Sequence, residues 1–297
     1  MIEFDFYKGS KTEIVLALGF FDCIHLGHLK LIETTKSLAE KYGANDCIFT
    51  FKNHHVSDFK GLKGVVNTYE ERVKKLEKLS VKSVIFSVFT NEFSRVSASE
   101  FLKLLISNFN IKAIVCGRDY KFGYGGEGKV TLLKEFCNKN SIELVVEDDV
   151  YFGNVKVSTT LVKKLLLGGD VKTANLLLTY PYEMCGEVVK DRQVGRKLGF
   201  PTANVLINKQ KAPLKVGVYK TYVIIEGKRY NCITNYGSRP TYSLDSVLIE
   251  TYIDGFSGDL YGKEITVYFT DYIRDCVKFD SEKQLIEQLN CDLEKIR

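Results

Sequence analysis

The chain has 297 residues, of which 45% are hydrophobic and 27% charged, as in a soluble globular protein with one large or two ordinary domains. Its net charge of +5 is too small and too dispersed to indicate nucleic-acid binding, although it suits an anionic small molecule. The eight cysteines form no C-x-x-C pair, and neither a secretory signal nor an apolar run of membrane-spanning length is visible, so we expect a cytoplasmic protein with reduced thiols and without a nucleic-acid or membrane partner.

Short apolar runs rich in β-branched residues alternate with helical patterns in the first 180 residues. The runs span 13–19, 47–51, 83–89, 112–117 and 142–147. Between them, the spacings Thr68-x-x-Glu71 and Ser97-x-x-Glu100 indicate capping boxes at the starts of helices. Strands separated by helices predict a Rossmann-like α/β domain, with a parallel sheet that helices cover on both faces.

The stretch GFFDCIHLGH (19–28) joins the first predicted strand to an amphipathic helix. Such a passage lies at the carboxyl edge of a parallel sheet, where α/β proteins bind ligands. The N-terminus of the helix favours an anion, Gly27 lets a phosphate approach the backbone, and His25 and His28 can donate hydrogen bonds to phosphate oxygens. Two alternatives stay open: a zinc site made by both histidines and Asp22 with His54 or His55, or histidines that only cap or pack.

The pattern changes after Pro181. A helix begins at Ser158 and another follows through TANLLL (173–178) before this proline. Beyond it, strands follow one another with Gly-containing turns between them. A final helix starts at Ser281, where Gln284 completes a capping box. We predict an antiparallel β-barrel with a C-terminal helix, and two domains that span 1–180 and 181–297.

The stretch GRKLGFPTANV (195–205) lies early in the predicted barrel. Gly195 and Gly199 indicate a loop, and beyond it Thr202 and Asn204 alternate on an extended segment, so that both side-chain oxygens point the same way. Two such oxygens can complete a Mg²⁺ shell whose other ligands are phosphates and water. The alternative is an ordinary polar turn.

Together these motifs resemble those of a known family, the bacterial bifunctional riboflavin kinase / FMN adenylyltransferase (FAD synthetase). GFFDCIHLGH is similar to the H-x-G-H signature of nucleotidyltransferases. Further stretches that resemble the adenylyltransferase half are FTFKNHH (49–55), VCGRDYKFGYGGEG (115–128) and VSTTLVKKLL (157–166). GRKLGFPTAN is similar to the riboflavin kinase signature, and it is followed in family order by GVYKTYV (217–223), NYGSRPT (235–241), IETYIDGFSGDLYGK (249–263) and IRDCVKF (273–279).

For the first domain, the resemblance implies transfer of AMP from ATP to FMN. His25 and His28 would contact the triphosphate and stabilise the transition state, while Asp22 would orient the loop or a Mg²⁺. The full set of residues that it implies for ATP and its phosphates is Gly19, Phe20, Asp22, His25, His28, Asp119, Ser158, Thr159 and Lys163. Asn53 would line the path of the flavin phosphate.

For the second domain, the resemblance implies phosphorylation of riboflavin by ATP. Glu250 would be the general base toward the 5′-hydroxyl, Thr202 and Asn204 would hold Mg²⁺ with ATP, and Arg274 would contact the flavin or the loop around it. The loop with Gly195 and Gly199 would cover the phosphates. The implied partners are riboflavin, FMN and ATP.

Three positions depart from the family pattern. The family has Gly at Cys23, Pro-His-Pro at residues 53–55 and Arg at Lys163. These departures leave open an enzyme in which only the kinase half is active. A flavin-binding regulatory protein is the alternative of another class, against which Thr202, Asn204 and Glu250 argue, because a binder needs neither a base nor metal ligands.

Overall fold

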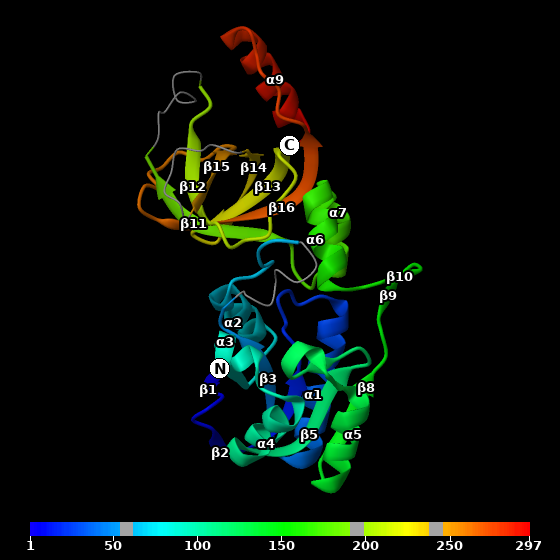
Figure 1. Ribbon diagram of the computed structural model, residues 1–297. Coiled ribbons are helices and arrows are strands. Elements are labelled where there is room, and N and C mark those ends of the chain that lie inside the picture. Colours follow the sequence, from blue (N-terminus) through cyan, green and yellow to red (C-terminus); the bar gives the residue numbers. More distant parts are fainter. Residues whose placement is uncertain (54–61, 191–198, 238–245) are drawn as a thin grey trace. The chain divides into compact units, whose positions relative to one another are not determined.

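The structure, a computed structural model, describes residues 1–53, 62–190, 199–237 and 246–297. Its residues form two compact units, Met1–Thr159 and Thr160–Arg297 (Figure 1). Of the residues singled out above, His54, His55 and Gly195 lie outside the described ranges. Each unit is therefore described by itself.

A parallel sheet of six strands forms the centre of the first unit, in the order β1-β4-β3-β2-β5-β8. The strands are β1 (Ile2–Asp5), β2 (Ser10–Leu18), β3 (Asn45–Phe51), β4 (Ser83–Ser87), β5 (Phe109–Gly117) and β8 (Glu143–Glu147). The α/β prediction is confirmed. The sequence pattern missed β1, because its four residues, IEFD, include two acids and no apolar run.

Helices connect these strands. They are α1 (Leu26–Tyr42), α2 (Tyr69–Lys78), α3 (Asn91–Ser94), α4 (Ala98–Asn108) and α5 (Val130–Lys139). Both bonds of the predicted capping box join Thr68 and Glu71 at the start of α2. At the start of α4, the Ser97 side chain accepts the hydrogen bond of the Glu100 N–H. These local caps each stabilise a helix start by about 1 kcal/mol.

Both faces of the sheet are buried. In the central strand β2, the neighbouring residues Leu16 and Ala17 point to opposite faces, and neither is exposed. Leu16 shares a hydrophobic cluster with Phe101 of α4 and Leu133 of α5. Helix α1 contacts β2, β3 and β5, and its buried residues lie outside that cluster, so it covers the other face. A strand buried on both sides is held rigidly, which fixes the loop that follows it.

A closed antiparallel barrel forms most of the second unit, with the strand order β11-β12-β15-β14-β13-β16 (Figure 1). The strands are β11 (Glu183–Val189), β12 (Thr202–Asn208), β13 (Gly217–Ile225), β14 (Lys228–Tyr236), β15 (Ser246–Ile253) and β16 (Glu264–Arg274). This confirms the predicted barrel. The β13–β14 hairpin turns at Glu226 and Gly227, which both have positive φ, as a two-residue type I′ turn requires.

Two helices that precede the barrel pack with it. They are α6 (Thr159–Gly168) and α7 (Val171–Leu177), and α7 lies against β16 (Figure 1). Asn175 of α7 donates to the Phe269 carbonyl and accepts from the Tyr182 N–H. The compact units thus divide at 159/160, earlier along the chain than the change of sequence pattern near 181. The functional limits 1–180 and 181–297 stay a prediction.

The C-terminal helix α9 (Glu282–Glu294) is anchored to the barrel by a buried ion pair. Asp292 of this helix is fully buried, and Arg274 donates to it from Nε at 2.9 Å and from Nη2 at 2.7 Å. Leu293 and Ile296 add an apolar contact with Val218 and other barrel residues. The guanidinium of Arg274 is therefore committed to the helix, and its predicted contact with flavin stays a prediction.

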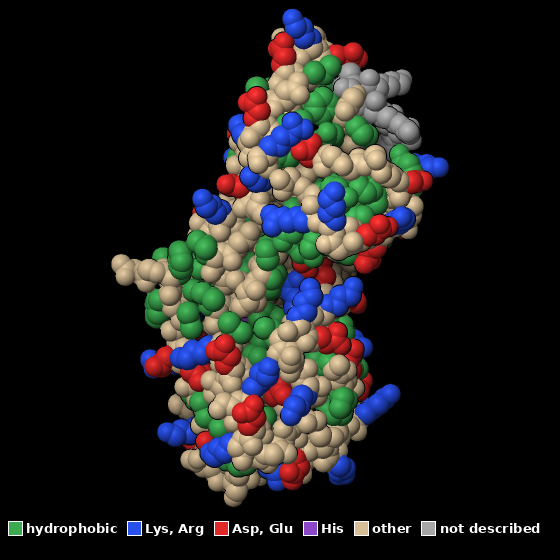
Figure 2. All heavy atoms as spheres, turned by 180° about the vertical axis from the view of Figure 1, so that it is seen from behind, with side chains coloured by type: hydrophobic (Ala, Val, Ile, Leu, Met, Phe, Trp, Pro, Cys, Tyr) green, Lys and Arg blue, Asp and Glu red, His purple; other side chains and the backbone are tan. Residues whose placement is uncertain are grey.

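Surface charge is mixed. Figure 2 shows Lys and Arg side chains interspersed with Asp and Glu on the visible face, as the small net charge of +5 leads one to expect. Among the residues described, no helix is both long enough and apolar enough to cross a membrane.

Replacing Asp292 by Asn should destabilise the second unit. The substitution keeps the shape of the side chain but leaves the Arg274 charge beside a neutral amide in a buried place, which costs about 3–5 kcal/mol. Urea unfolding measures the loss, and hydrogen exchange should rise across 282–294. The control is Lys283→Ala, which removes an exposed pair with Glu287 at 4.0 Å and should cost under about 0.5 kcal/mol. Equal stabilities of the two variants would contradict the role of the pair.

Candidate active sites

The first candidate site lies where the parallel sheet changes direction. From β2 the chain proceeds to β3 on one side, and it later returns to β5 on the other side of β2. The carboxyl ends of β2 and β5 therefore flank a topological switch point, the usual ligand site of open α/β sheets. The loop that begins at Gly19 follows β2, and the turn with Asp119 follows β5. The structure thus brings these two predicted segments to one edge.

The loop after β2 is sharply bent. Phe21 has φ of 53°, which is strained for a bulky residue, and its ring is buried 4.6 Å from the ring of His28. A Cβ atom at position 19 would lie 2.9 Å from the Phe21 ring, so only glycine fits at the start of the bend. The bent backbone at Phe21 thus packs the aromatic ring of this residue against the ring of His28.

Two buried charged side chains hold this loop. Asp22 accepts a hydrogen bond from the Val66 N–H at 2.8 Å, which agrees with a loop-orienting role. Arg72 of α2 is 1% exposed, and its Nη1 donates to the Phe20 carbonyl at 3.1 Å while its guanidinium lies over the Phe20 ring. Arg72 was not predicted from the sequence, because its position in a polar helix gives no sign that it is buried.

The two histidines are stacked, with ring centroids 3.8 Å apart. His25 is the N-cap of α1, and its Nδ1 accepts from the His28 N–H at 3.2 Å. The Nδ1 of His28 bonds to the Cys23 carbonyl, which can only accept, so this nitrogen carries the proton. Capping is therefore one task of His25, and both rings leave their Nε2 atoms for other partners.

Burial sets the protonation of both rings. It lowers the pKa of His25 well below its ordinary value and that of His28 to about 4, since a charged imidazole would lose its hydration. Both are thus neutral at pH 7. Because His25 accepts at Nδ1, it carries its proton on Nε2, whereas His28 presents a bare lone pair on Nε2.

Further groups surround the histidine loop. Thr159 accepts from the Cys23 thiol at 3.5 Å, so the start of α6 reaches the loop, and Ser158 directly precedes it. Lys156 binds Asp119 at 2.7 Å, and its charge contributes to lowering the pKa of His25. Lys156 was missed by the sequence analysis, although it directly precedes the VSTT motif.

Two further predicted residues are Asn53 and Lys163. Asn53 uses both ends of its amide on the backbone of Phe89, each at 2.8 Å, and so links the segments that follow β3 and β4. Lys163 lies on α6 in the second unit and is buried there. Their contacts with the flavin phosphate and with ATP stay predictions.

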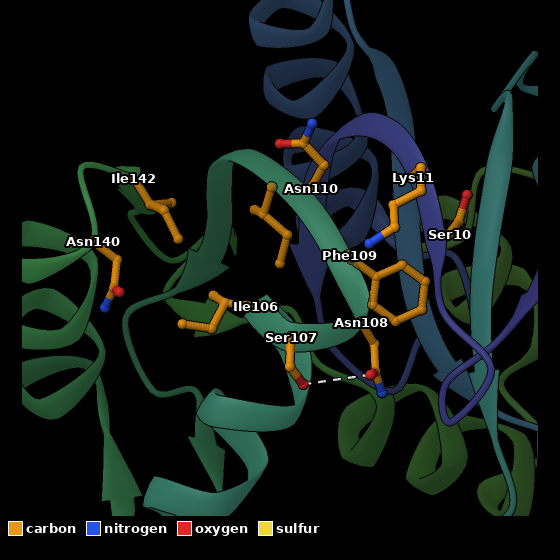
Figure 3. Close-up of a pocket in the computed structure, with 10 residues that line it drawn as sticks. Ser10, Lys11, Ile106, Ser107, Asn108, Phe109, Asn110, Asn140 and Ile142 are labelled. Carbon is orange, nitrogen blue, oxygen red and sulfur yellow. Dashed lines mark hydrogen bonds between the residues drawn. The ribbon is translucent and has the colours of Figure 1, made fainter.

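A cavity of about 360 Å³ lies elsewhere in the first unit (Figure 3). Lys11, Asn108, Phe109 and Asn140 are among its lining residues, which places it at the amino ends of β2 and β5. The histidine loop follows the opposite ends of these strands. None of the predicted site residues lines the cavity, so we do not assign the chemistry to it.

The second candidate site is a row of side chains across three barrel strands. Asn204 of β12 pairs directly with Glu250 of β15, which in turn pairs with Asn235 of β14. Directly opposite residues of antiparallel strands share a face, and Thr202 lies on that face two residues before Asn204. Thr251, the next residue along β15, is fully buried. Glu250 therefore points away from the barrel interior.

One atom of this row lacks a partner. Asn204 is 7% exposed, and its Oδ1 accepts no hydrogen bond from the described part of the chain. A buried polar oxygen in this condition costs about 1–3 kcal/mol, which a bound cation would offset. The Oδ1 of Asn235 accepts from the Cys276 thiol at 3.2 Å. Gly199, before the row, has φ of 80° and open space around it.

Comparison with known proteins covers both units. The FAD synthetase family matches residues 8–161, and the riboflavin kinase family matches residues 178–297. A Listeria monocytogenes protein named bifunctional riboflavin kinase/FMN adenylyltransferase is 32% identical over 95% of this chain and 91% of its own. A Bacillus subtilis protein of the same name is 31% identical over 96% and 92%.

The fold is also found in a solved structure. A Streptococcus pneumoniae crystal structure, described as a macrolide-efflux protein, is 30% identical with a TM-score of 0.89, and the match covers 100% of this chain and 99% of that one. Two family matches in chain order, and relatives that span nearly the whole chain, show that the chain belongs to the family of bifunctional riboflavin kinase/FMN adenylyltransferase enzymes.

Proposed function

We propose that the second unit transfers the terminal phosphoryl group of ATP to riboflavin, and that the first unit transfers AMP from a second ATP to the resulting FMN, giving FAD and pyrophosphate. One observation carries the proposal: a single chain holds a histidine loop at a sheet switch point and a carboxylate beside a buried amide oxygen on a barrel. The proposed substrates are riboflavin, FMN and ATP, and Mg²⁺ is the metal that accompanies ATP. The proposed location of the enzyme is the cytoplasm.

In adenylyl transfer, the first unit must hold two anions, FMN and ATP, close together while negative charge increases on the phosphate oxygens. The FMN phosphate attacks the α-phosphorus in line, so the enzyme supplies position and charge compensation instead of a nucleophile. The Nε2–H of His25 is the ready donor. Gly27 lies against the His25 ring, where a Cβ would come within 3.1 Å of its Cε1, so the backbone there stays bare for a phosphate.

Two lysines belong to the proposed phosphate site. Lys156 lies near His25 and is held by Asp119 and Asp149, each at 2.7 Å. Lys163 adds a second charge by the family likeness, although it lacks the planar fork of arginine. Thr159 and Ser158, beside Cys23, offer hydroxyl groups to the leaving phosphates.

Phosphorylation of riboflavin requires a general base and a metal site in the second unit. Glu250 takes the proton from the 5′-hydroxyl as it attacks the terminal phosphate of ATP. Its neighbours Asn204 and Asn235 hold the strand register that presents it. Thr202 and Asn204 would hold Mg²⁺, and the unpartnered Oδ1 of Asn204 fits a hard cation that takes oxygen ligands. When bound, the ion neutralises charge on the phosphates.

The direct test is a chromatographic product assay with riboflavin, ATP and Mg²⁺. FMN should appear first and FAD should follow. FMN that accumulates without FAD would instead support an enzyme with an active kinase half alone, as the departures at Cys23, residues 53–55 and Lys163 leave open. Binding of riboflavin without any product would support the regulatory alternative.

Replacing Glu250 by Gln should lower FMN formation by about 10²–10⁴-fold, because the amide cannot accept the hydroxyl proton. Conversion of added FMN to FAD should stay unchanged. The matched control is Glu264→Gln, an exposed carboxylate at the start of β16, which should leave both activities as they are. Joint loss of both activities in Glu250→Gln would contradict the division of labour between the units.

Replacing His28 by Ala should give the reverse pattern. FMN-to-FAD conversion should fall by about 10²–10³-fold, as for the loss of one transition-state donor, with riboflavin phosphorylation retained. His28→Asn keeps a donor for the Cys23 carbonyl and so separates loss of chemistry from collapse of the loop. Lys134→Ala, an exposed change on α5, serves as control. Full FAD synthesis in His28→Asn would remove His28 from the site.

Binding of ATP to the first unit should take up a proton. His28 has a pKa of about 4 and a bare Nε2, so it must gain a proton before it can donate to a phosphate, and the anionic ligand raises its pKa. The bound state then holds more protons than the free state, and affinity should fall as pH rises through the bound-state pKa.

Calorimetry with a non-hydrolysable ATP analogue at pH 7 measures this uptake. The observed heat should depend on the ionisation enthalpy of the buffer, and subtraction of the His28→Asn titration isolates the first site from the kinase site. No difference in proton uptake between the two proteins would show that His28 stays neutral in the complex.

A further inference from the structure

We propose that Cys23, His25 and His28 form a binding site for Zn²⁺ or a similar borderline-soft divalent cation, and that the bound ion shuts off adenylyl transfer while the kinase half stays active. One ligand atom of each residue lies within 4.8 Å of those of the other two. Within the described ranges no other three His, Cys, Asp or Glu side chains converge in this way. The inhibition rests on the proposed function, whereas the metal site does not.

The three ligands lie in one short segment, which consists of the loop after β2 and the first turn of α1. A tetrahedral zinc ion with bonds of about 2.3 Å to sulfur and about 2.0–2.1 Å to nitrogen needs its ligand atoms about 3.3–3.6 Å apart. The ligand atoms here lie within 4.8 Å of one another, and rotation of the side chains can bring them to this spacing. The backbone of the loop is fixed by the bonds from Asp22 to Val66 and from Arg72 to Phe20. Little ordering of the chain remains for the metal to bring about.

His28 is already arranged as a metal ligand. Histidines that bind metals usually donate their second ring N–H to a carbonyl or carboxylate, which fixes the tautomer and aims the free lone pair. The Nδ1 of His28 makes this bond to the Cys23 carbonyl, so its Nε2 lone pair is free.

The other two ligands, Cys23 and His25, each lose a hydrogen bond when they bind the metal. Cys23 loses its thiol proton to solvent when the thiolate binds the cation, and it leaves Thr159, its partner at 3.5 Å. His25 gives up the hydrogen bond that caps α1 if it turns toward the metal. Sulfur and imidazole ligands select Zn²⁺ or Co²⁺ over the oxygen-seeking Mg²⁺ that accompanies ATP.

A metal at this place excludes the phosphates. The same ring nitrogens that would donate to ATP are bound to the ion, and His25 no longer closes the N-terminus of α1. His28 is only partly buried, whereas Cys23 is fully buried. At the barrel row, Asn204 and Glu250 offer oxygen ligands, and the Cys276 thiol beside Asn235 joins no group of three converging ligands within the described ranges, so we expect no such effect there.

Cobalt reports the site directly, without any enzyme assay. Addition of Co²⁺ to the full chain should produce a near-ultraviolet thiolate-to-cobalt absorption band that saturates at one equivalent. Cys23→Ala should abolish the band. Cys276→Ala, which removes an exposed thiol of the second unit, should keep it. Absence of the band in the unaltered chain, or its survival in Cys23→Ala, would overturn the metal site.

Zinc titration then tests the consequence. FMN-to-FAD conversion by the unaltered chain, in excess Mg²⁺, should be inhibited, and Cys23→Ala should need at least about tenfold more zinc, as expected when one of three ligands is lost. Riboflavin phosphorylation should be equally insensitive in both. Equal inhibition of the two proteins would overturn the proposal while leaving the proposed function intact. A cobalt band that depends on Cys23, together with FAD synthesis that zinc does not inhibit, would confirm the metal site but show that ATP does not bind to the two histidines.

Discussion

The hydrogen bond from His28 Nδ1 to the Cys23 carbonyl determines what the first site can do. A carbonyl only accepts, so the bond fixes the tautomer and leaves a lone pair on Nε2 of His28. The bond in turn depends on the bend at Phe21, whose left-handed backbone turns the loop back and puts its ring under His28. Two adjacent imidazoles thereby receive different roles: His25 offers a proton and His28 a lone pair.

The second site depends on strand register instead of on a strained loop. Asn204, Glu250 and Asn235 stand opposite one another on three neighbouring strands, and a slip by one residue would turn Glu250 into the barrel interior. Interior packing resists such a slip, because Thr234 and Thr251 are fully buried and hydrogen-bonded to each other at 3.0 Å. The packing of the barrel interior therefore fixes the position of the Glu250 carboxylate, although this side chain points away from the interior.

The sequence could predict features whose cause is local. Strand β2, the Thr68–Glu71 capping box and the helix start at Ser281 each follow from neighbouring residues, and the histidine loop follows from its place after a strand. Arg72, Lys156 and the Asp292–Arg274 pair could not be predicted, since each depends on contacts between residues far apart in the chain. The packing of α6 and α7 with the barrel could not be predicted for the same reason, because the periodicity of a helix sequence does not show which distant element the helix packs against.

The two sites treat the charge of ATP in opposite ways. As proposed, the first site would receive phosphates with N–H donors and a helix N-terminus, and its two histidines are neutral before the ligand arrives. The second offers a carboxylate and a buried amide oxygen, which attract a cation first and phosphates only through it. Under these proposals, a hard ion is part of the second site, whereas a soft ion competes with the substrate of the first. One chain would then respond to two classes of metal with its two halves separately, because its ligand atoms differ in kind.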